Sequence, residues 1–302
     1  MKVGDEQMDS NEIKAIMGNR YTIDCSQIVL TPRLPNTSQM IHEGPGIISQ
    51  SVDGSFSLKM FCIGSVSIQD FFARFNLKAG EIIHEKYYYR LLAKDINGRQ
   101  WVSDWIMPDI QARHDTNDYI VIAGIRELSY SSEIPVKVAT DSVSTYFPGD
   151  IDLPLNTTTS VEKKVAGEKR QSSINLNIAS FQACHFDFEI EKEAGWLTLK
   201  AYSDASISID DAILIRLNES LQFVLGRSLS WKLIQMHQGN TKRVRVRSCK
   251  ENINQSRIFP PIQFQVIDSN TWLLFTKYLS YVINYSEISW HPIFRWVHTV
   301  IE

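Results

Sequence analysis

Two turn signals, each set between alternating runs of apolar residues, limit most strongly what this chain can fold into. Asp53-Gly54 lies inside GIISQSVDGSFSLKMFC, and Asn97-Gly98 lies inside YYYRLLAKDINGRQWVSDWI. Asp-Gly and Asn-Gly favour the tight turns that join antiparallel strands, because glycine accepts a positive φ at no steric cost. The first half of the chain is therefore predicted to be an antiparallel β domain, with one short helix expected at 67–80.

The second half begins again with strands, HFDFEIEKE and WLTLKAY, and then changes to a helical pattern. In DDAILIRLNESLQFVLGR, Asp210 can cap a helix, apolar residues recur at helical spacing, and Gly226 can end it. We expect a mainly β (α+β) protein with two antiparallel β-sandwich-like domains, each a sandwich or a strongly curved sheet. The expected parts are an N-terminal tail (1–20), a first β-rich domain (21–147), a linker or long loop (148–172), a second β-rich domain with its helix (173–268, helix 210–226) and a helical extension (269–302).

Charge and cysteine usage restrict the function classes. The net charge of -3 means that any contact with nucleic acid must come from a local patch. The four cysteines are scattered without a C-x-x-C pair, which is typical of reduced thiols. The polar N-terminus is no signal peptide, and the apolar stretch around Lys277 is too short to span a bilayer. We expect a cytoplasmic protein without a membrane partner.

One basic stretch, TKRVRVRSCK, is the strongest candidate binding element. Arg243, Arg245 and Arg247 alternate with valines, so a β-strand turns the three guanidinium groups to one face. Together with Lys242 they form a candidate contact for anions or nucleic acid.

A second interpretation of the same arginines is structural. In HFDFEIEKE the alternation is reversed in sign, with Asp187, Glu189 and Glu191 on one parity. If this acidic strand and the arginine strand are neighbours in one sheet, their charges pair across it and bind nothing else. Both interpretations remain open at this point.

Trp101 and Trp105 lie four residues apart, a spacing at which both side chains share one face of a strand. An exposed pair suits stacking on a base or a sugar, whereas a buried pair fills a core. The seven histidines include no pair at the spacing of a helical metal site. We therefore predict no catalytic residues, no metal ligands and no cofactor.

Several segments resemble one protein family. These are GIISQSVDGSFSLKMF, LLAKDINGRQWVS and IAGIRELSY in the first half, and IDDAILIRLNESLQFVLGRSLSW through RIFPPI in the second. They are similar to the N-terminal region of ApeA-type, HEPN-containing bacterial anti-phage defence proteins. The family's helix-to-strand pattern is matched here by Leu221, Phe223, Val224, Gly226, Leu229 and Trp231.

The resemblance implies two β-rich domains placed before a helical HEPN ribonuclease domain. The nuclease signature is an arginine followed four to six residues later by a histidine, and no arginine here has one; Arg295 and His298 are only three apart. The resemblance thus places the nuclease beyond Glu302.

The expected function is a non-catalytic recognition and regulatory region of a larger bacterial anti-phage, abortive-infection protein. Its expected partners are a C-terminal effector domain or partner protein, a phage-derived trigger, RNA, and a second copy of the chain. The alternative is a stand-alone binding module for nucleic acid or carbohydrate.

Overall fold

The structure is a computed structural model of the chain. It describes residues 8, 10–34, 39–64, 83–112, 118–133, 141–154, 158–165, 168–175, 177–203, 207–249, 261 and 269–284. The chain divides into two compact units. Unit 1 contains Met1–Ile134 and Thr241–Lys250, and unit 2 contains Pro135–Asn240 and Glu251–Glu302. The helix expected at 67–80 lies outside the described residues.

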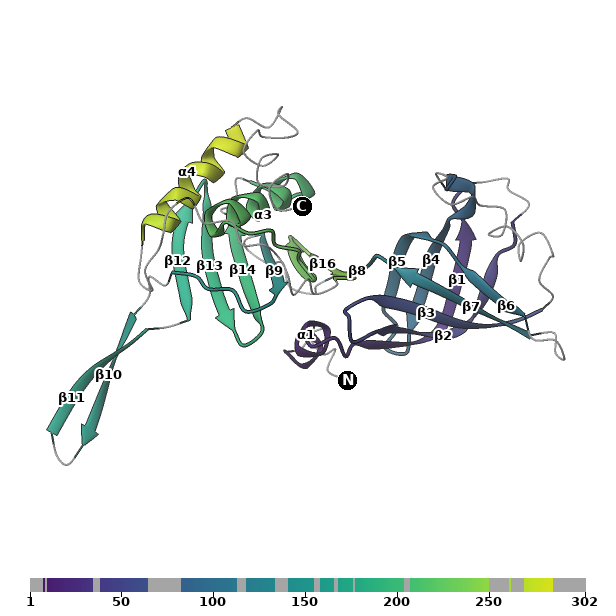
Figure 1. Ribbon diagram of the computed structural model, residues 1–302, viewed down its shortest axis with the longest axis horizontal. Helices are drawn as coiled ribbons and strands as arrows, with labels where there is room; N and C mark the ends of the chain where they lie inside the picture. The colour runs from purple at the N-terminus through teal and green to yellow at the C-terminus, as the bar shows by residue number, and fades with distance from the viewer. Residues whose placement is uncertain are drawn as a thin grey trace. The chain divides into compact units, whose positions relative to one another are not determined.

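Unit 1 is one antiparallel sheet preceded by a short helix (Figure 1). Its described elements are α1 (Ser10–Met17), β1 (Thr22–Pro32), β2 (His42–Gln50), β3 (Phe56–Ile63), the 3-10 helix η1 (Glu85–Tyr87), β4 (Tyr89–Asp95), β5 (Gln100–Ile106), β6 (Asp109–Ala112), β7 (Asp118–Ile125), β8 (Glu127–Glu133) and β16 (Thr241–Arg247). The strands follow the spatial order β16-β8-β5-β4-β1-β2-β3-β7-β6.

The strand order of unit 1 requires the sheet to curl. β7 and β8 are joined through Arg126 alone, yet they stand near opposite ends of the order. Because one residue cannot bridge the width of a flat sheet, the wall must bend round until its two sides meet, as in a barrel. Of the two forms predicted for this domain, the strongly curved sheet is the one observed.

The inside of the curved wall is the core of unit 1. β3 illustrates the alternation, since Phe56, Leu58, Met60 and Cys62 are all buried and the residues between them are exposed. Trp101 is fully buried and meets the rings of Tyr21 and Tyr130 edge-on, with centroids 6.3 and 4.6 Å away.

Both predicted hairpins are present, and helix α1 lies against the end of the wall where they turn. Gly54 has a φ of +85° in the β2–β3 turn, and a Cβ there would lie 2.2 Å from the carbonyl oxygen of Cys249. Arg99, in the β4–β5 turn, donates to Glu12 of α1 at 2.8 Å. Asn19, just after α1, donates to the carbonyl of Val52 at 2.9 Å.

Unit 2 is a smaller antiparallel sheet with helices on one face (Figure 1). Its described elements are β9 (Ser142–Pro148), β10 (Thr158–Val165), β11 (Glu168–Asn175), β12 (Ile178–Ala183), β13 (Phe186–Glu193), β14 (Trp196–Ser203), α3 (Asp211–Leu225), β15 (Leu233–Gln238) and α4 (Asn270–Asn284). The order is β12-β13-β14-β9-β15, and β10 and β11 form a separate two-stranded ribbon.

Helix α3 begins and ends where the sequence predicts. The side chain of Asp210 accepts from the backbone N–H of Ile213 at 2.8 Å, and Gly226 takes the left-handed conformation at the C-terminus. Its apolar stripe packs on the sheet together with α4, which confirms the helical extension as far as residue 284; residues 285–302 lie outside the described part.

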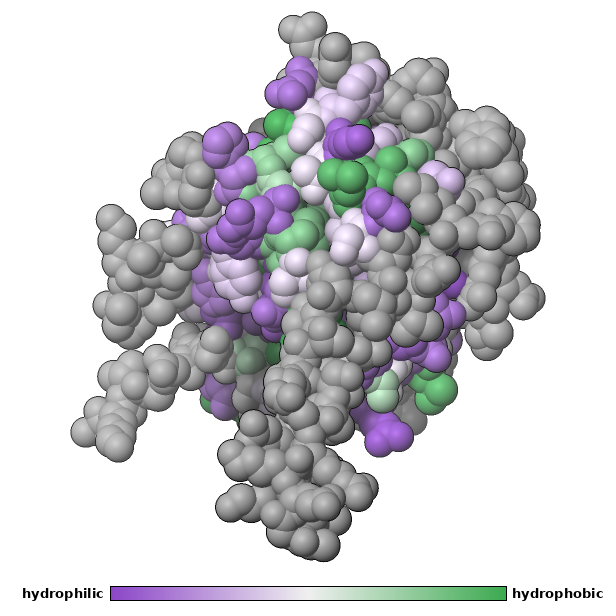
Figure 2. Space-filling model, turned by 90° about the vertical axis from the view of Figure 1, so that its left-hand side faces the viewer, coloured by the Kyte–Doolittle hydropathy of each residue, from purple (hydrophilic) through white to green (hydrophobic). Residues whose placement is uncertain are grey.

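Helix α4 is fixed to unit 2 by aromatic stacking and by buried hydrogen bonds. Trp272 stacks on Phe181 with ring centroids 5.1 Å apart, and the Tyr278 hydroxyl donates to the buried carboxylate of Glu219 at 3.0 Å. Where Figure 2 colours the surface by hydropathy, hydrophilic residues are interspersed with hydrophobic patches. Among the described residues of unit 2, the exposed large apolar side chains are Tyr202, Ile215, Leu273 and Tyr281.

The division of the chain differs from the expected domains. β9 was assigned to the first domain (21–147), but it pairs with β14 and β15 of unit 2. β16 was assigned to the second domain (173–268), but it pairs with β8 of unit 1. The segment expected to be a linker or loop (148–172) contains β10 and the start of β11. Strand pairing between distant segments, and not chain order, sets these boundaries.

Candidate functional site

The arginine strand forms an outer strip of the unit 1 wall. Val244 and Val246 of β16 are fully buried, whereas Arg243 and Arg245 are partly exposed and Arg247 is exposed. The alternation in the sequence therefore predicts the correct faces.

Of the two interpretations left open for the arginines, pairing with the acidic strand is wrong. β16 pairs with β8 in unit 1, whereas β13, which carries the acidic residues, pairs with β12 and β14 in unit 2. Arg245 instead forms an ion pair with Glu127 at 2.6 Å. Glu189 and Glu191 pair with Lys200 at 2.6 and 3.1 Å. Arg245 and the two glutamates thus have partners within their own units, and the sign match between the two strands was coincidental.

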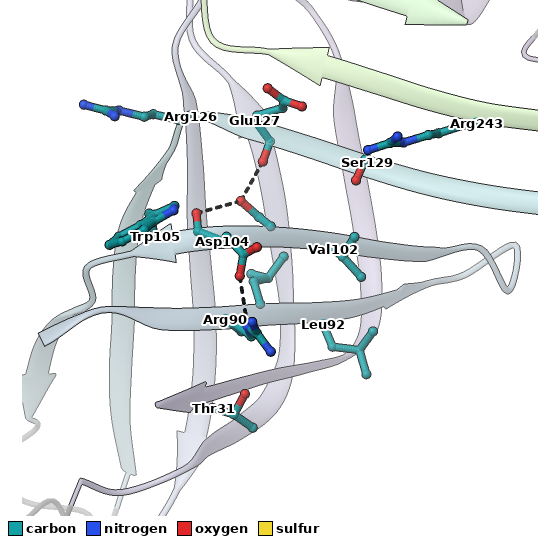
Figure 3. A pocket seen from close by; sticks show the side chains of 12 residues that line it. Thr31, Arg90, Leu92, Val102, Asp104, Trp105, Arg126, Glu127, Ser129 and Arg243 are labelled. Atoms are coloured by element: carbon teal, nitrogen blue, oxygen red, sulfur yellow. Dashed lines mark hydrogen bonds and ion pairs between the residues drawn. The ribbon is translucent and has the colours of Figure 1, made fainter. Parts of the chain in front are cut away.

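A groove of about 550 Å³ runs over the outer face of unit 1 beside the arginine strand (Figure 3). Arg126 and Arg243 lie towards its two ends, and the carboxylate of Asp104 lies between them. Ser103 donates to the carbonyl of Glu127 at 2.6 Å and so ties β5 to β8 beneath the groove. The groove is lined by Thr31, Arg90, Leu91, Leu92, Val102, Ser103, Asp104, Trp105, Arg126, Glu127, Ser129 and Arg243.

Strand register explains why these residues meet. Leu92 of β4 is opposite Val102 of β5, Val102 is opposite Ser129 of β8, and Ser129 is opposite Arg245 of β16. Directly opposed residues point to the same face of a sheet, so four strands contribute to one outer row. The groove is therefore built on regular strands and not on loops.

The wall around the groove is locally positive although the chain carries a net charge of -3. Arg90 pairs with Asp104 at 3.1 Å, but among the described residues no carboxylate forms an ion pair with the exposed Arg126. Cations outnumber carboxylates on the outer positions of β4, β5, β8 and β16 and at the β7–β8 bend. The cations are Arg90, Lys94, Arg126, Arg243, Arg245 and Arg247, and the carboxylates are Asp104, Glu127 and Glu133.

The prediction that Trp101 and Trp105 share a face is wrong. Tyr89 pairs with Ile106, and Leu91 pairs with Ser103, so β5 has one residue more than β4 between the two pairs. This β-bulge reverses the alternation, which leaves Trp101 buried in the core and Trp105 half exposed on the outer wall. The two rings cannot form one stacking surface.

Trp105 is held in place at one end of the groove. The guanidinium of Arg33 lies over its ring at 3.8 Å from the centroid, and Tyr88 meets it edge-on at 5.3 Å. Arg33 is itself fixed by Glu85 at 3.0 Å and by Asp104 at 3.2 Å. An aromatic ring with fixed orientation therefore stands next to several cations.

The structure changes the set of candidate residues. Lys242 is buried on the core side of β16 and is therefore no longer a candidate contact residue. Arg90 and Arg126 line the groove and become candidates, although the sequence analysis did not identify either of them. Arg90 follows an inward tyrosine in YYYRLLAK, so period-two alternation could have placed it outside, but only the register brings it beside the arginine strand.

Two further titratable groups of unit 1, Asp95 and Cys25, are buried within the fold. The carboxylate of Asp95 accepts from Trp101 and Arg99. Burial, with the charges of Asp95 and Asp24, raises the pKa of Cys25 to about 12. In the part of the chain that the structure describes, no group of three or more His, Cys, Asp or Glu side chains could hold a metal ion.

None of the described helices is both long and apolar enough to cross a membrane. The sequence matches no family model, and the searches of curated proteins and of solved structures gave no match either.

Proposed function

We propose that this chain is a non-catalytic recognition module and that unit 1 binds nucleic acid in the groove on its outer wall. The observation that carries the proposal is the excess of cations along β4, β5, β8 and β16, which surrounds a groove built on paired strands. Nucleic-acid contact through a local basic patch is compatible with the negative net charge of the chain.

The geometry of β16 suits a phosphate backbone. Alternate residues of a strand are about 7 Å apart, so Arg243, Arg245 and Arg247 present guanidinium groups at regular intervals. Guanidinium groups bind phosphate oxygens in a bidentate manner, and Arg245 can exchange its surface ion pair with Glu127 for a phosphate. The exposed Arg126 extends the same positive strip across the β7–β8 bend.

The proposed biological setting comes from the sequence resemblance. As in ApeA-type proteins, the module regulates an effector domain, proposed to be a HEPN ribonuclease, within a larger bacterial anti-phage protein of the cytoplasm. Binding of a phage-derived nucleic acid is then the trigger. In a phage-infection assay with the full-length protein, groove variants lose protection while an effector variant retains binding.

Fluorescence anisotropy with a labelled 20-nucleotide RNA and the same DNA sequence tests the binding step. The wild-type chain binds at 50 mM salt and weakens as salt rises, because phosphate binding releases counterions. Arg126→Glu with Arg243→Glu lowers affinity at least tenfold. Lys14→Glu with Lys59→Glu, two exposed cations elsewhere in unit 1, makes the same change in net charge and lowers affinity less than threefold.

Three results contradict the proposal: no binding at low salt, binding that is indifferent to salt, or equal losses in the two double variants. Salt-independent binding of an oligosaccharide in place of RNA and DNA favours the second candidate, a carbohydrate module, for which the exposed ring of Trp105 is the stacking surface.

A further inference from the structure

Trp105 has a backbone conformation that is unusual for its residue type. Its φ is +62°, in the left-handed region that bulky residues rarely adopt. Trp105 takes this conformation within the bulge of β5, and the extra residue turns the ring outward while Ile106 returns to the core. A glycine or asparagine at this position fulfils the same backbone role without strain.

The side chain of Trp105 adds a second unfavourable feature. Half of it, 50%, is exposed to solvent, and it lines the groove. A strained backbone and an exposed large ring both oppose folding, and strained positions of this kind cluster at functional sites. The ring is also held by Arg33 and Tyr88, so its orientation is set before any ligand arrives.

We infer that the groove takes a single-stranded nucleic acid and that Trp105 stacks on one of its bases. This inference rests on the proposed function and adds to it the strandedness of the ligand and the residue that contacts a base. Arg33 covers one face of the ring, while Arg90 and Arg126 lie within the same groove to receive the adjoining phosphates. A duplex keeps its bases stacked inside, so it cannot offer a base to Trp105.

The test separates base contacts from phosphate contacts. Three labelled DNA ligands are compared at one salt concentration: a 12-nucleotide oligothymidylate, a 12-nucleotide abasic strand with the same phosphates, and a 12-base-pair duplex. The wild-type chain binds oligothymidylate on the order of tenfold more tightly than the abasic strand, because base–aromatic stacking contributes that much.

Variants of Trp105 assign this difference to its ring. Trp105→Gly, which suits the positive φ, removes the tenfold preference and leaves affinity for the abasic strand unchanged. Trp105→Phe keeps most of the preference. Tyr202→Ala removes an aromatic side chain of similar exposure, 39%, from unit 2 and changes neither affinity.

The outcomes distinguish this inference from the proposed function. Equal binding of oligothymidylate and abasic strand by the wild type, with the arginine double variant still weakened, overturns the role of Trp105 and leaves the phosphate-binding groove standing. Tighter binding of the duplex, or a Trp105→Gly variant that weakens both single strands equally, also overturns it. Failure of all three ligands to bind overturns the proposed function as well.

Discussion

At the scale of single residues, Asp95 organises the β4–β5 turn of unit 1. Its buried carboxylate accepts from the backbone N–H groups of Asn97 and Arg99, both at 2.9 Å. It also accepts from the Arg99 side chain and from the Trp101 indole, both at 3.1 Å. One side chain therefore fixes a turn, an arginine and the largest ring of the core.

Asp95→Ala is expected to destabilise unit 1 by about 3 kcal/mol, because it leaves buried donors without an acceptor and a partly buried guanidinium with one partner fewer. Urea unfolding followed by tryptophan fluorescence measures the change. Asp104→Ala is the control, since its side chain is 53% exposed and Arg33, the less exposed of its two partners, keeps its ion pair with Glu85. Its loss is expected to stay below about 1 kcal/mol. Similar losses for both variants contradict the structural role of Asp95.

Cys25 makes the stability of unit 1 depend on alkaline pH. Burial raises its pKa from 9.0 to about 12, so the folded state holds the thiol proton more tightly than the unfolded chain does. The stabilisation that this raised pKa gives the folded state is therefore complete below pH 9, and it is lost as pH rises towards 12. Between pH 8 and 10 it decreases by about 1 kcal/mol. Urea unfolding at pH 8, 9 and 10 is expected to show a shallower decline for Cys25→Ala, and equal slopes in the two proteins contradict this.

At the scale of elements, the bulge in β5 decides which face Trp105 occupies. We therefore expect glycine at position 105 to give a more stable protein than alanine, the reverse of the usual order in a strand. Trp105→Ala and Trp105→Gly lose the same contacts with Arg33 and Tyr88, but alanine keeps the strain of the left-handed conformation. The glycine variant is expected to be more stable by about 0.5–1 kcal/mol.

Val102 provides the matched control for the bulge prediction. It lies on the same strand, is 44% exposed and has regular neighbours, so Val102→Gly is expected to be less stable than Val102→Ala by about 1 kcal/mol. Thermal unfolding of the four variants measures both differences. The same order of alanine and glycine at the two positions argues against a backbone role for residue 105.

Sequence patterns predicted the elements better than their partners. The hairpins at Gly54 and Gly98, helix α3 and the inward valines of β16 all follow from local rules on turns, caps and alternation. The bulge at Trp105 does not, because one extra residue shifts the register without leaving a mark in composition. The prediction that Trp101 and Trp105 share a face was wrong for that reason, whereas the outward facing of Arg243, Arg245 and Arg247 was predicted correctly because β16 is regular.

At the scale of the whole molecule, what the sequence could not show is which strands pair across long separations. Arg243 and Arg90 are more than a hundred residues apart, and they line the same groove because only β8 and β5 lie between β16 and β4. Charge matching suggested the acidic strand β13 as the neighbour of β16. Ion pairs at a surface, however, contribute little free energy compared with the burial of two valines. Apolar burial therefore determines which strand pairs with β16.

The pairing of β16 with β8 also predicts how unit 1 can be isolated. Glu133 at the end of β8 is directly opposite Thr241 at the start of β16. A two-residue Asn-Gly turn can therefore join residues 1–133 to residues 241–250 in place of the whole of unit 2. This shortened chain is expected to unfold cooperatively in urea, because it contains every described strand of the unit 1 wall.

A fragment that ends at residue 134 lacks β16 and is expected to be less stable by several kcal/mol, since full burial of each valine contributes about 1.5–3 kcal/mol. The joined chain with Val244→Ser and Val246→Ser keeps the length and the turn but not the apolar contacts, so it is expected to resemble the fragment. Equal urea midpoints for the fragment and the joined chain contradict the assignment of β16 to unit 1. They also remove Arg243 from the groove and Arg245 from the strand beside it, because the position of both side chains depends on that pairing.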